Sequence, residues 1–111
     1  MCHDPWRRVR QAENLNDLCA HLRRYQPKSA LEIGTCHGLS ACYFAATLAT
    51  WGGHLCTLEL SPLNFQHAQN TLADAGLNNI TAVRVDALDY LAQKPSTTQY
   101  DWVFIDGQKT K

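Results

Sequence analysis

The sequence predicts an α/β protein built on a doubly wound parallel sheet. Short apolar segments alternate with longer amphipathic segments along the chain, which is the pattern of parallel strands joined by helical crossovers. The first apolar segment ends in a turn that carries Gly34 and Gly38 and leads into a helix-like segment. The chain has 111 residues, the size of a domain with one hydrophobic core. We therefore expect a single domain over residues 1–111.

The first part of the chain contains a helix, a strand and a second helix. Apolar residues at three- and four-residue steps predict a helix over residues 8–25, which ends before Pro27. Residues 30–33 form a short apolar run and are predicted to be a buried strand. A second helix is predicted over residues 39–50. Its apolar side consists of Leu39, Cys42, Tyr43, Ala46 and Ala49.

The second strand and the third helix have clear boundaries. Residues 54–60 are predicted to be a strand. Ser61 and Pro62 follow, and they match an N-cap and the first position of a helix. The helix is expected over residues 63–75, with Gly76 as its left-handed C-terminal residue.

The last elements complete the predicted sheet. Residues 80–85 are short and rich in β-branched side chains and are predicted to be the third strand. A short helix is expected over residues 88–93. Residues 100–105 are predicted to be the fourth strand, with the apolar run 102–105 buried on both faces. We expect the strand order 3-2-1-4, with a ligand crevice between the first and fourth strands.

Composition and charge exclude several classes of protein. The net charge is zero, so the basic surplus of a nucleic-acid-binding protein is missing and a nucleic-acid partner is not expected. No segment has the length of apolar sequence that a membrane helix needs, and Asp4 and Pro5 stand where a signal peptide would be apolar. We expect a cytoplasmic protein with no membrane contact. The five cysteines lack metal-site spacing and are expected to be free thiols.

Carboxylates occur at the predicted ends of all four strands. They are Glu32, Glu59, Asp86 and Asp106. A hydrophobic core alone does not require them, so together they favour a polar or cationic ligand at this edge of the sheet. A dinucleotide is disfavoured because Cys36 replaces the middle glycine of its fingerprint. Glu32, just before the turn, would also repel a pyrophosphate.

At this point the chain resembles class I S-adenosylmethionine-dependent methyltransferases. The motifs that carry the resemblance are Glu32-x-Gly34-x-Cys36-x-Gly38, Glu59, Asp86-Ala87 and Asp106, in this order. The sequence around the first motif, together with Phe104-Ile105-Asp106-Gly107-x-Lys109, is similar to the corresponding sequences of the catechol and caffeoyl-CoA type O-methyltransferases. The resemblance covers residues 28–111 and implies a Rossmann-like fold, here an incomplete class I methyltransferase fold.

The resemblance also implies roles for particular residues. Gly34 and Gly38 would shape the loop under the methionine part of the cofactor, and Glu32 would position that part. The other implied contacts are Ser40 to the methionine carboxylate, Glu59 to the ribose hydroxyls, and Asp86 with Ala87 to the adenine. Asp106 would bind Mg²⁺ or another divalent cation, and Lys109 would act as general base.

These implications lead to one main hypothesis and to two alternatives. We expect O-methyl transfer from S-adenosylmethionine to a hydroxyl of a small-molecule acceptor, with this chain carrying mainly the cofactor-binding half. The family's other metal ligands lie beyond Lys111, so we expect a C-terminally truncated chain with weak or absent activity by itself. The alternatives are a non-catalytic Rossmann-type nucleotide-binding module and a module that dimerises through its exposed fourth strand.

Overall fold

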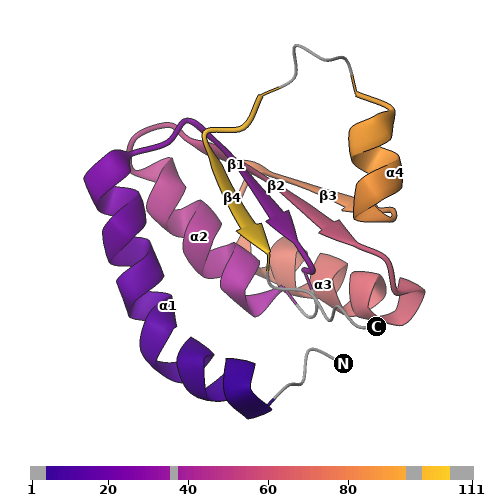
Figure 1. The fold of residues 1–111 in the computed structure, drawn as a ribbon, viewed down its shortest axis with the longest axis horizontal. Coiled ribbons are helices and arrows are strands. Elements are labelled where there is room, and N and C mark those ends of the chain that lie inside the picture. Colours follow the sequence, from indigo (N-terminus) through magenta and orange to yellow (C-terminus); the bar gives the residue numbers. More distant parts are fainter. Residues whose placement is uncertain (1–4, 36–37, 95–98, 106–111) are drawn as a thin grey trace.

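A computed structural model describes residues 5–35, 38–94 and 99–105, with side chains from Leu15 onward. Four parallel strands form one sheet in the order β3-β2-β1-β4 (Figure 1). The strands are β1 (Ser29–Ile33), β2 (His54–Glu59), β3 (Ile80–Arg84) and β4 (Trp102–Ile105). The helices are α1 (Pro5–Tyr25), α2 (Leu39–Ala49), α3 (Pro62–Ala75) and α4 (Ala87–Ala92). The predicted fold class and strand order are confirmed.

The observed elements differ from the predicted ones only at their ends. The first helix begins at Pro5 rather than at residue 8, and the fourth strand begins at Trp102 rather than at residue 100. The predicted cap residues of α3, Ser61 and Gly76, are confirmed. The Ser61 hydroxyl accepts a hydrogen bond from the Asn64 N–H, and Gly76 ends the helix with a φ of 68°. None of the described helices is long and apolar enough to cross a membrane.

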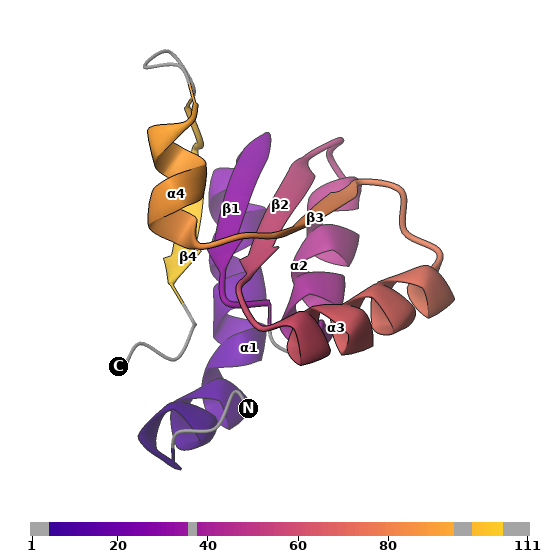
Figure 2. The same ribbon diagram turned by 90° about the vertical axis from the view of Figure 1, so that its right-hand side faces the viewer.

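The two faces of the sheet are covered unequally. Helices α1, α2 and α3 lie on one face, and α4 lies on the other (Figure 2). The larger core forms between the sheet and the three helices. Its buried members are Cys19, Leu22, Ala30, Ala41, Phe44, Ala45, Leu48, Leu55 and Phe104. At its centre the rings of Phe44 from α2 and Phe104 from β4 stack with centroids 3.9 Å apart.

A smaller core lies under α4 on the opposite face. Its buried members are Leu31, Cys56 and Leu58, and Tyr90 of α4 packs against them. The Tyr90 hydroxyl lies 3.0 Å from the Tyr100 hydroxyl and 3.4 Å from the Cys56 sulfur. Burial raises the pKa of Tyr90, and the hydrogen bonds to Cys56 and Tyr100 raise it further, so the phenol stays protonated.

The apolar side predicted for the second helix is wrong. Leu39 and Tyr43, which belong to it, are exposed. The residues that α2 buries are Ser40, Ala41, Phe44, Ala45, Thr47 and Leu48. Nearly all of α2 is apolar, so spacing alone fits more than one face. The face that is buried is the one whose small alanines allow close packing and whose Phe44 meets Phe104.

The prediction that the fourth strand is buried on both faces is also wrong. Trp102 and Phe104 point into the larger core, whereas Val103 is 49% exposed and Ile105 is 70% exposed. Successive side chains of a strand point to opposite faces, and in the described part of the chain α4 is the only helix on the second face. Helix α4 packs against the cluster around Leu31 and Leu58 and leaves Val103 and Ile105 uncovered.

Three of the five cysteines lie within the described residues. Cys19, Cys42 and Cys56 are free thiols, as predicted. Cys2 and Cys36 lie outside the described residues.

The difference between the two faces of β4 predicts losses of stability of different size for two neighbouring substitutions. Phe104→Ala removes the stack with Phe44 and leaves a cavity, so we expect a loss of about 3 kcal/mol in the free energy of unfolding. Val103→Ala on the exposed face serves as the control and should cost less than about 1 kcal/mol. Urea unfolding followed by circular dichroism measures both. Equal losses for the two variants would contradict this assignment of the faces.

Candidate functional site

The predicted carboxylates that the structure describes gather at one edge of the sheet, where the parallel strands end. Glu59 is the last residue of β2, and Asp86 follows β3 as the N-cap of α4. The Val85 N–H donates to the Glu59 carbonyl over 3.1 Å, which holds the two strand ends together. Glu32 is the second-last residue of β1 and pairs in register with Thr57 of β2. The sheet topology therefore brings these three acids to one rim.

The glycine turn after β1 is fixed to the neighbouring strand. The N–H groups of Gly34 and Thr35 both donate to the Leu58 carbonyl, over 2.8 and 3.0 Å. Gly34 has a φ of 98° and Gly38 a φ of 89°, values that L side chains rarely adopt. A Cβ at Gly38 would also lie 3.2 Å from the Cα of Ala68 in α3. Both glycines are therefore required by backbone geometry, and Gly38 also by close packing.

The turn ends at the N-terminus of α2. Gly38 is the N-cap, and no side chain of that residue caps the helix. The first intrahelical bond runs from the Cys42 N–H to the Gly38 carbonyl over 3.0 Å. The earlier N–H groups of a helix have no intrahelical acceptor, and the helix dipole makes this end favourable for an anion. The turn therefore presents at the rim a helix N-terminus that is favourable for an anion.

Beneath the turn lies a hydrogen-bonded network of buried polar side chains. Glu32 is 0% exposed, and its carboxylate accepts a hydrogen bond from the Ser40 hydroxyl and another from the Thr57 hydroxyl, each 2.7 Å long. The Thr35 hydroxyl lies 2.5 Å from that of Thr57. Because Thr57 gives its proton to Glu32, Thr35 must donate to Thr57. These bonds compensate for burying a carboxylate.

The network places Glu32 and Ser40 differently from the expectation that both contact the methionine part of the cofactor. Glu32 is fully buried below the turn, so it supports the loop from beneath. Ser40 gives its hydroxyl proton to Glu32. Burial raises the pKa of the neighbouring Cys42 thiol, and the charge of Glu32 raises it further. Cys42 therefore stays a thiol near neutral pH.

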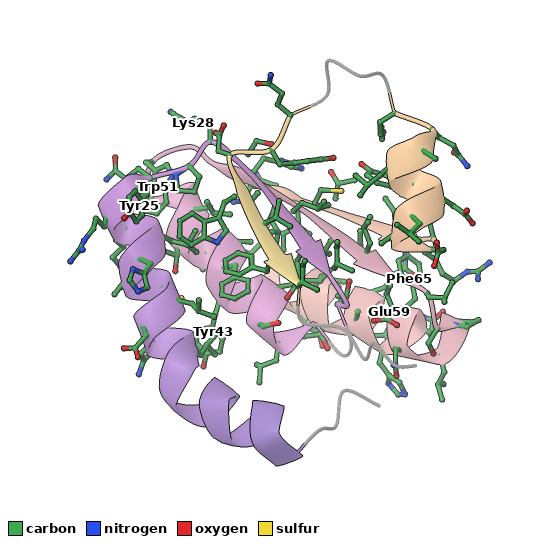
Figure 3. The ribbon with its side chains drawn as sticks, in the orientation of Figure 1. Tyr25, Lys28, Tyr43, Trp51, Glu59 and Phe65 are labelled. Carbon is green, nitrogen blue, oxygen red and sulfur yellow. The ribbon has the colours of Figure 1, made fainter. Side chains whose placement is uncertain are left out.

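Glu59 is held at the rim with little freedom. Its side chain is 8% exposed, and Oε2 accepts a hydrogen bond from the Ser61 N–H over 3.0 Å. Ser61 also accepts the bond from the Phe65 N–H that starts α3. Figure 3 shows Glu59 and Phe65 on the same side of the molecule, at the ends of the strands and away from Lys28 and Trp51.

Asp86 and Ala87 lie at the start of α4. The Asp86 Oδ2 accepts a hydrogen bond from the Asp89 N–H over 3.1 Å. Ala87 packs against the smaller core and fixes the start of the helix to the sheet. A carboxylate has a second oxygen with its own lone pairs, so a capping aspartate retains capacity to accept from a ligand.

The predicted metal ligand and general base, Asp106 and Lys109, lie outside the described residues. Among the described residues, no group of three or more His, Cys, Asp or Glu side chains could hold a metal ion.

Sequence reasoning missed Thr35 and Thr57. Thr57 is 0% exposed in the middle of β2, where its neighbours in the strand are apolar. A hydroxyl in an otherwise apolar buried strand needs a partner, and this was the available signal. The partner could not be named from the sequence, because Glu32 and Thr57 are 25 residues apart and meet only through strand register.

Comparisons with known proteins identify the family of this chain. A family described as a methyltransferase domain matches residues 31–111. The chain is 36% identical over 87 residues to a catechol O-methyltransferase of Niastella koreensis, which covers 76% of this chain and 39% of that protein.

Two solved structures share the fold. The O-methyltransferase TomG from Streptomyces achromogenes, in complex with S-adenosylmethionine, has a TM-score of 0.76 and 32% identity. The O-methyltransferase from Bacillus cereus, in complex with S-adenosylhomocysteine, has a TM-score of 0.77 and 30% identity. Each comparison covers 86% of this chain and 44% of the other.

The chain thus spans less than half the length of the relatives that it matches. The family match nevertheless takes in the glycine turn, the network beneath it and the rim acids Glu59 and Asp86. The chain therefore belongs to the methyltransferase domain family and has the Rossmann-like fold of class I methyltransferases.

Proposed function

We propose that this chain binds S-adenosylmethionine at the rim and serves methyl transfer to a hydroxyl group of a small-molecule acceptor. The observation that carries the proposal is the order of groups along one edge of the sheet. A helix N-terminus comes first, the Glu59 carboxylate second and the Asp86 carboxylate third. The cofactor has an anionic carboxylate, a ribose diol and an adenine amino group, which need these partners in this order.

Each part of the cofactor is matched by a group of suitable chemistry. The methionine carboxylate is placed at the first turn of α2, where backbone N–H groups and the helix dipole favour an anion. The contact from Ser40 is then made by its N–H, because its hydroxyl donates to Glu32. Glu59 accepts from the ribose hydroxyls, and Asp86 with Ala87 receives the adenine. Solved relatives in complex with S-adenosylmethionine or S-adenosylhomocysteine support the choice of this cofactor.

Methyl transfer itself asks for alignment and an ionised acceptor. The methyl carbon passes from the sulfonium to the acceptor oxygen in one displacement, so a near-attack geometry contributes much of the rate. We propose Lys109 as the base that takes the hydroxyl proton. A divalent cation at Asp106 would lower the pKa of that hydroxyl. The catechol O-methyltransferase relative supports a hydroxyl acceptor.

A second candidate role rests on β4. Among the described strands it is at the edge of the sheet, and Val103 and Ile105 on it are exposed apolar side chains. Unpaired edge strands with apolar side chains favour pairing with another chain. Two copies joined through β4 would form a homodimer and would not require a ligand.

Cofactor binding is tested by calorimetric titration with S-adenosylhomocysteine. We expect Glu59→Gln to weaken the affinity by about tenfold or more, because a charged acceptor of the ribose hydroxyls is lost. Asp74→Asn, on an exposed position of α3, is the control and should bind like the wild-type chain.

Two outcomes would contradict the proposal. One is a folded wild-type chain that shows no heat of binding. The other is a melting temperature raised by NAD or ATP and unchanged by S-adenosylmethionine, which would favour the nucleotide-binding module.

The proposed divalent cation should affect methyl transfer but not cofactor binding. The groups assigned to the cofactor are backbone N–H groups and rim carboxylates, so EDTA should change the affinity for S-adenosylhomocysteine by less than about twofold. The transfer of a labelled methyl group to a catechol, which we expect to be weak for this chain alone, should fall when EDTA is added and return with Mg²⁺. Methyl transfer that EDTA leaves unchanged would contradict a role for a divalent cation.

The dimer is tested by light scattering with the variant Ile105→Lys. The side chain is 70% exposed, so the substitution should leave the fold intact and add charge to the edge. A wild-type dimer that becomes a monomer in the variant is the expected result. A wild-type chain that is monomeric at high concentration would exclude this role.

A further inference from the structure

The centre of β2 carries a buried hydroxyl that the proposed chemistry does not use. Thr57 is 0% exposed, and the side chains beside it in the strand, Cys56 and Leu58, are buried and apolar. Valine has nearly the same shape and would avoid the cost of burying a polar group. The hydroxyl is therefore explained by its bonds, which run to Glu32 and Thr35.

These bonds form a directed chain. Thr35 donates to Thr57, Thr57 donates to the Glu32 Oε1, and Ser40 donates to the Glu32 Oε2. All four side chains are at most 8% exposed, so water does not compete for the bonds. Hydrogen bonds to an ionised group in such surroundings are stronger than those between neutral groups. Both carboxylate oxygens of Glu32 are thereby held in one orientation.

The same hydrogen bonds connect the two ends of the glycine turn and attach the turn to β2. Glu32 lies before the turn and Ser40 after it, and their hydrogen bond joins the two ends of the turn. Thr35 lies within the turn, and its bond to Thr57 attaches the turn to β2. The position of the α2 N-terminus relative to β1 and β2 therefore depends on the Glu32 carboxylate. The orientation of that carboxylate in turn depends on Thr57.

We propose that Thr57, supported by Thr35, is a positioning residue for the amino-acid half of the cofactor. It acts through Glu32, which sets the turn and the helix end at which the methionine carboxylate is placed. This inference rests on the proposed function. It adds that the two halves of the cofactor are controlled separately, because Glu59 and Asp86 are held by the Ser61 and Asp89 N–H groups.

The experiment compares two ligands on the folded chain. S-adenosylhomocysteine has the amino-acid half, whereas 5′-methylthioadenosine retains the nucleoside and lacks that half. For Thr57→Val we expect the affinity for S-adenosylhomocysteine to fall by about tenfold or more, because Glu32 loses a donor and no longer holds the turn and the start of α2 in place. The affinity for 5′-methylthioadenosine should stay within about twofold of the wild-type value.

Two further variants separate positioning from a loss of stability. Thr57→Ser restores the hydroxyl and should recover most of the affinity for S-adenosylhomocysteine. Thr47→Val removes another buried hydroxyl, one that donates to the Tyr43 carbonyl within α2 and lies outside the network. It should bind both ligands like the wild-type chain. Should Thr57→Val not fold, Thr35→Val tests the same network, because it removes the bond that attaches the turn to β2. It leaves the bond from Thr57 to the buried Glu32 in place and so costs less stability.

Four results would overturn the inference, the last of them together with the proposed function. Thr57→Val and Thr35→Val could bind S-adenosylhomocysteine as tightly as the wild-type chain, which would show that the network does not act on the ligand. They could lose both ligands equally, which would show a general structural role. A wild-type chain that binds 5′-methylthioadenosine and S-adenosylhomocysteine with equal affinity would show that the amino-acid half makes no favourable contact at α2. A wild-type chain that binds neither would instead overturn the proposed function, and this inference with it.

Discussion

The buried carboxylate of Glu32 is the constraint on which the rest of the site depends. A charge in the interior is tolerated only when hydrogen-bond donors surround it. The described donors are hydroxyls that come from β2 and from the first turn of α2. The strand, the turn and the helix must therefore meet at one point, and that point lies directly below the rim. Removing a single donor leaves part of a buried charge unsatisfied, so these residues act as a unit.

The packing of α2 enforces the same arrangement from the other side. Helix α2 packs against the sheet through Ala41, Ala45 and Leu48. Its Phe44 stacks on Phe104 of β4. Gly38 lets the start of α2 approach Ala68 of α3 more closely than a side chain would allow. The helix end is thus fixed by apolar contacts along its length and by hydrogen bonds at its start. A rigid helix end suits a binding site, because little order has to be imposed when a ligand arrives.

The unequal covering of the sheet shows how far sequence patterns can mislead. The apolar run 102–105 indicated burial on both faces, yet Val103 and Ile105 are exposed because α4 packs over other strands. The apolar side predicted for α2 failed for a related reason. Almost any stripe on that helix is apolar, so the buried stripe is decided by the shape of the surfaces that it meets. Such contacts join residues far apart in the sequence, and periodicity carries no information about them.

The sequence by itself determined the order of strands and helices, the caps of α3, the two glycines and the acids at the strand ends. These features depend on local backbone preferences and on the rule that parallel strands end at one edge. Only the tertiary structure decided that Ser40 gives its proton to Glu32 and that Thr35 and Thr57 complete the network. The physical reason is that a buried charge takes its donors from whichever residues strand register and helix packing bring within reach.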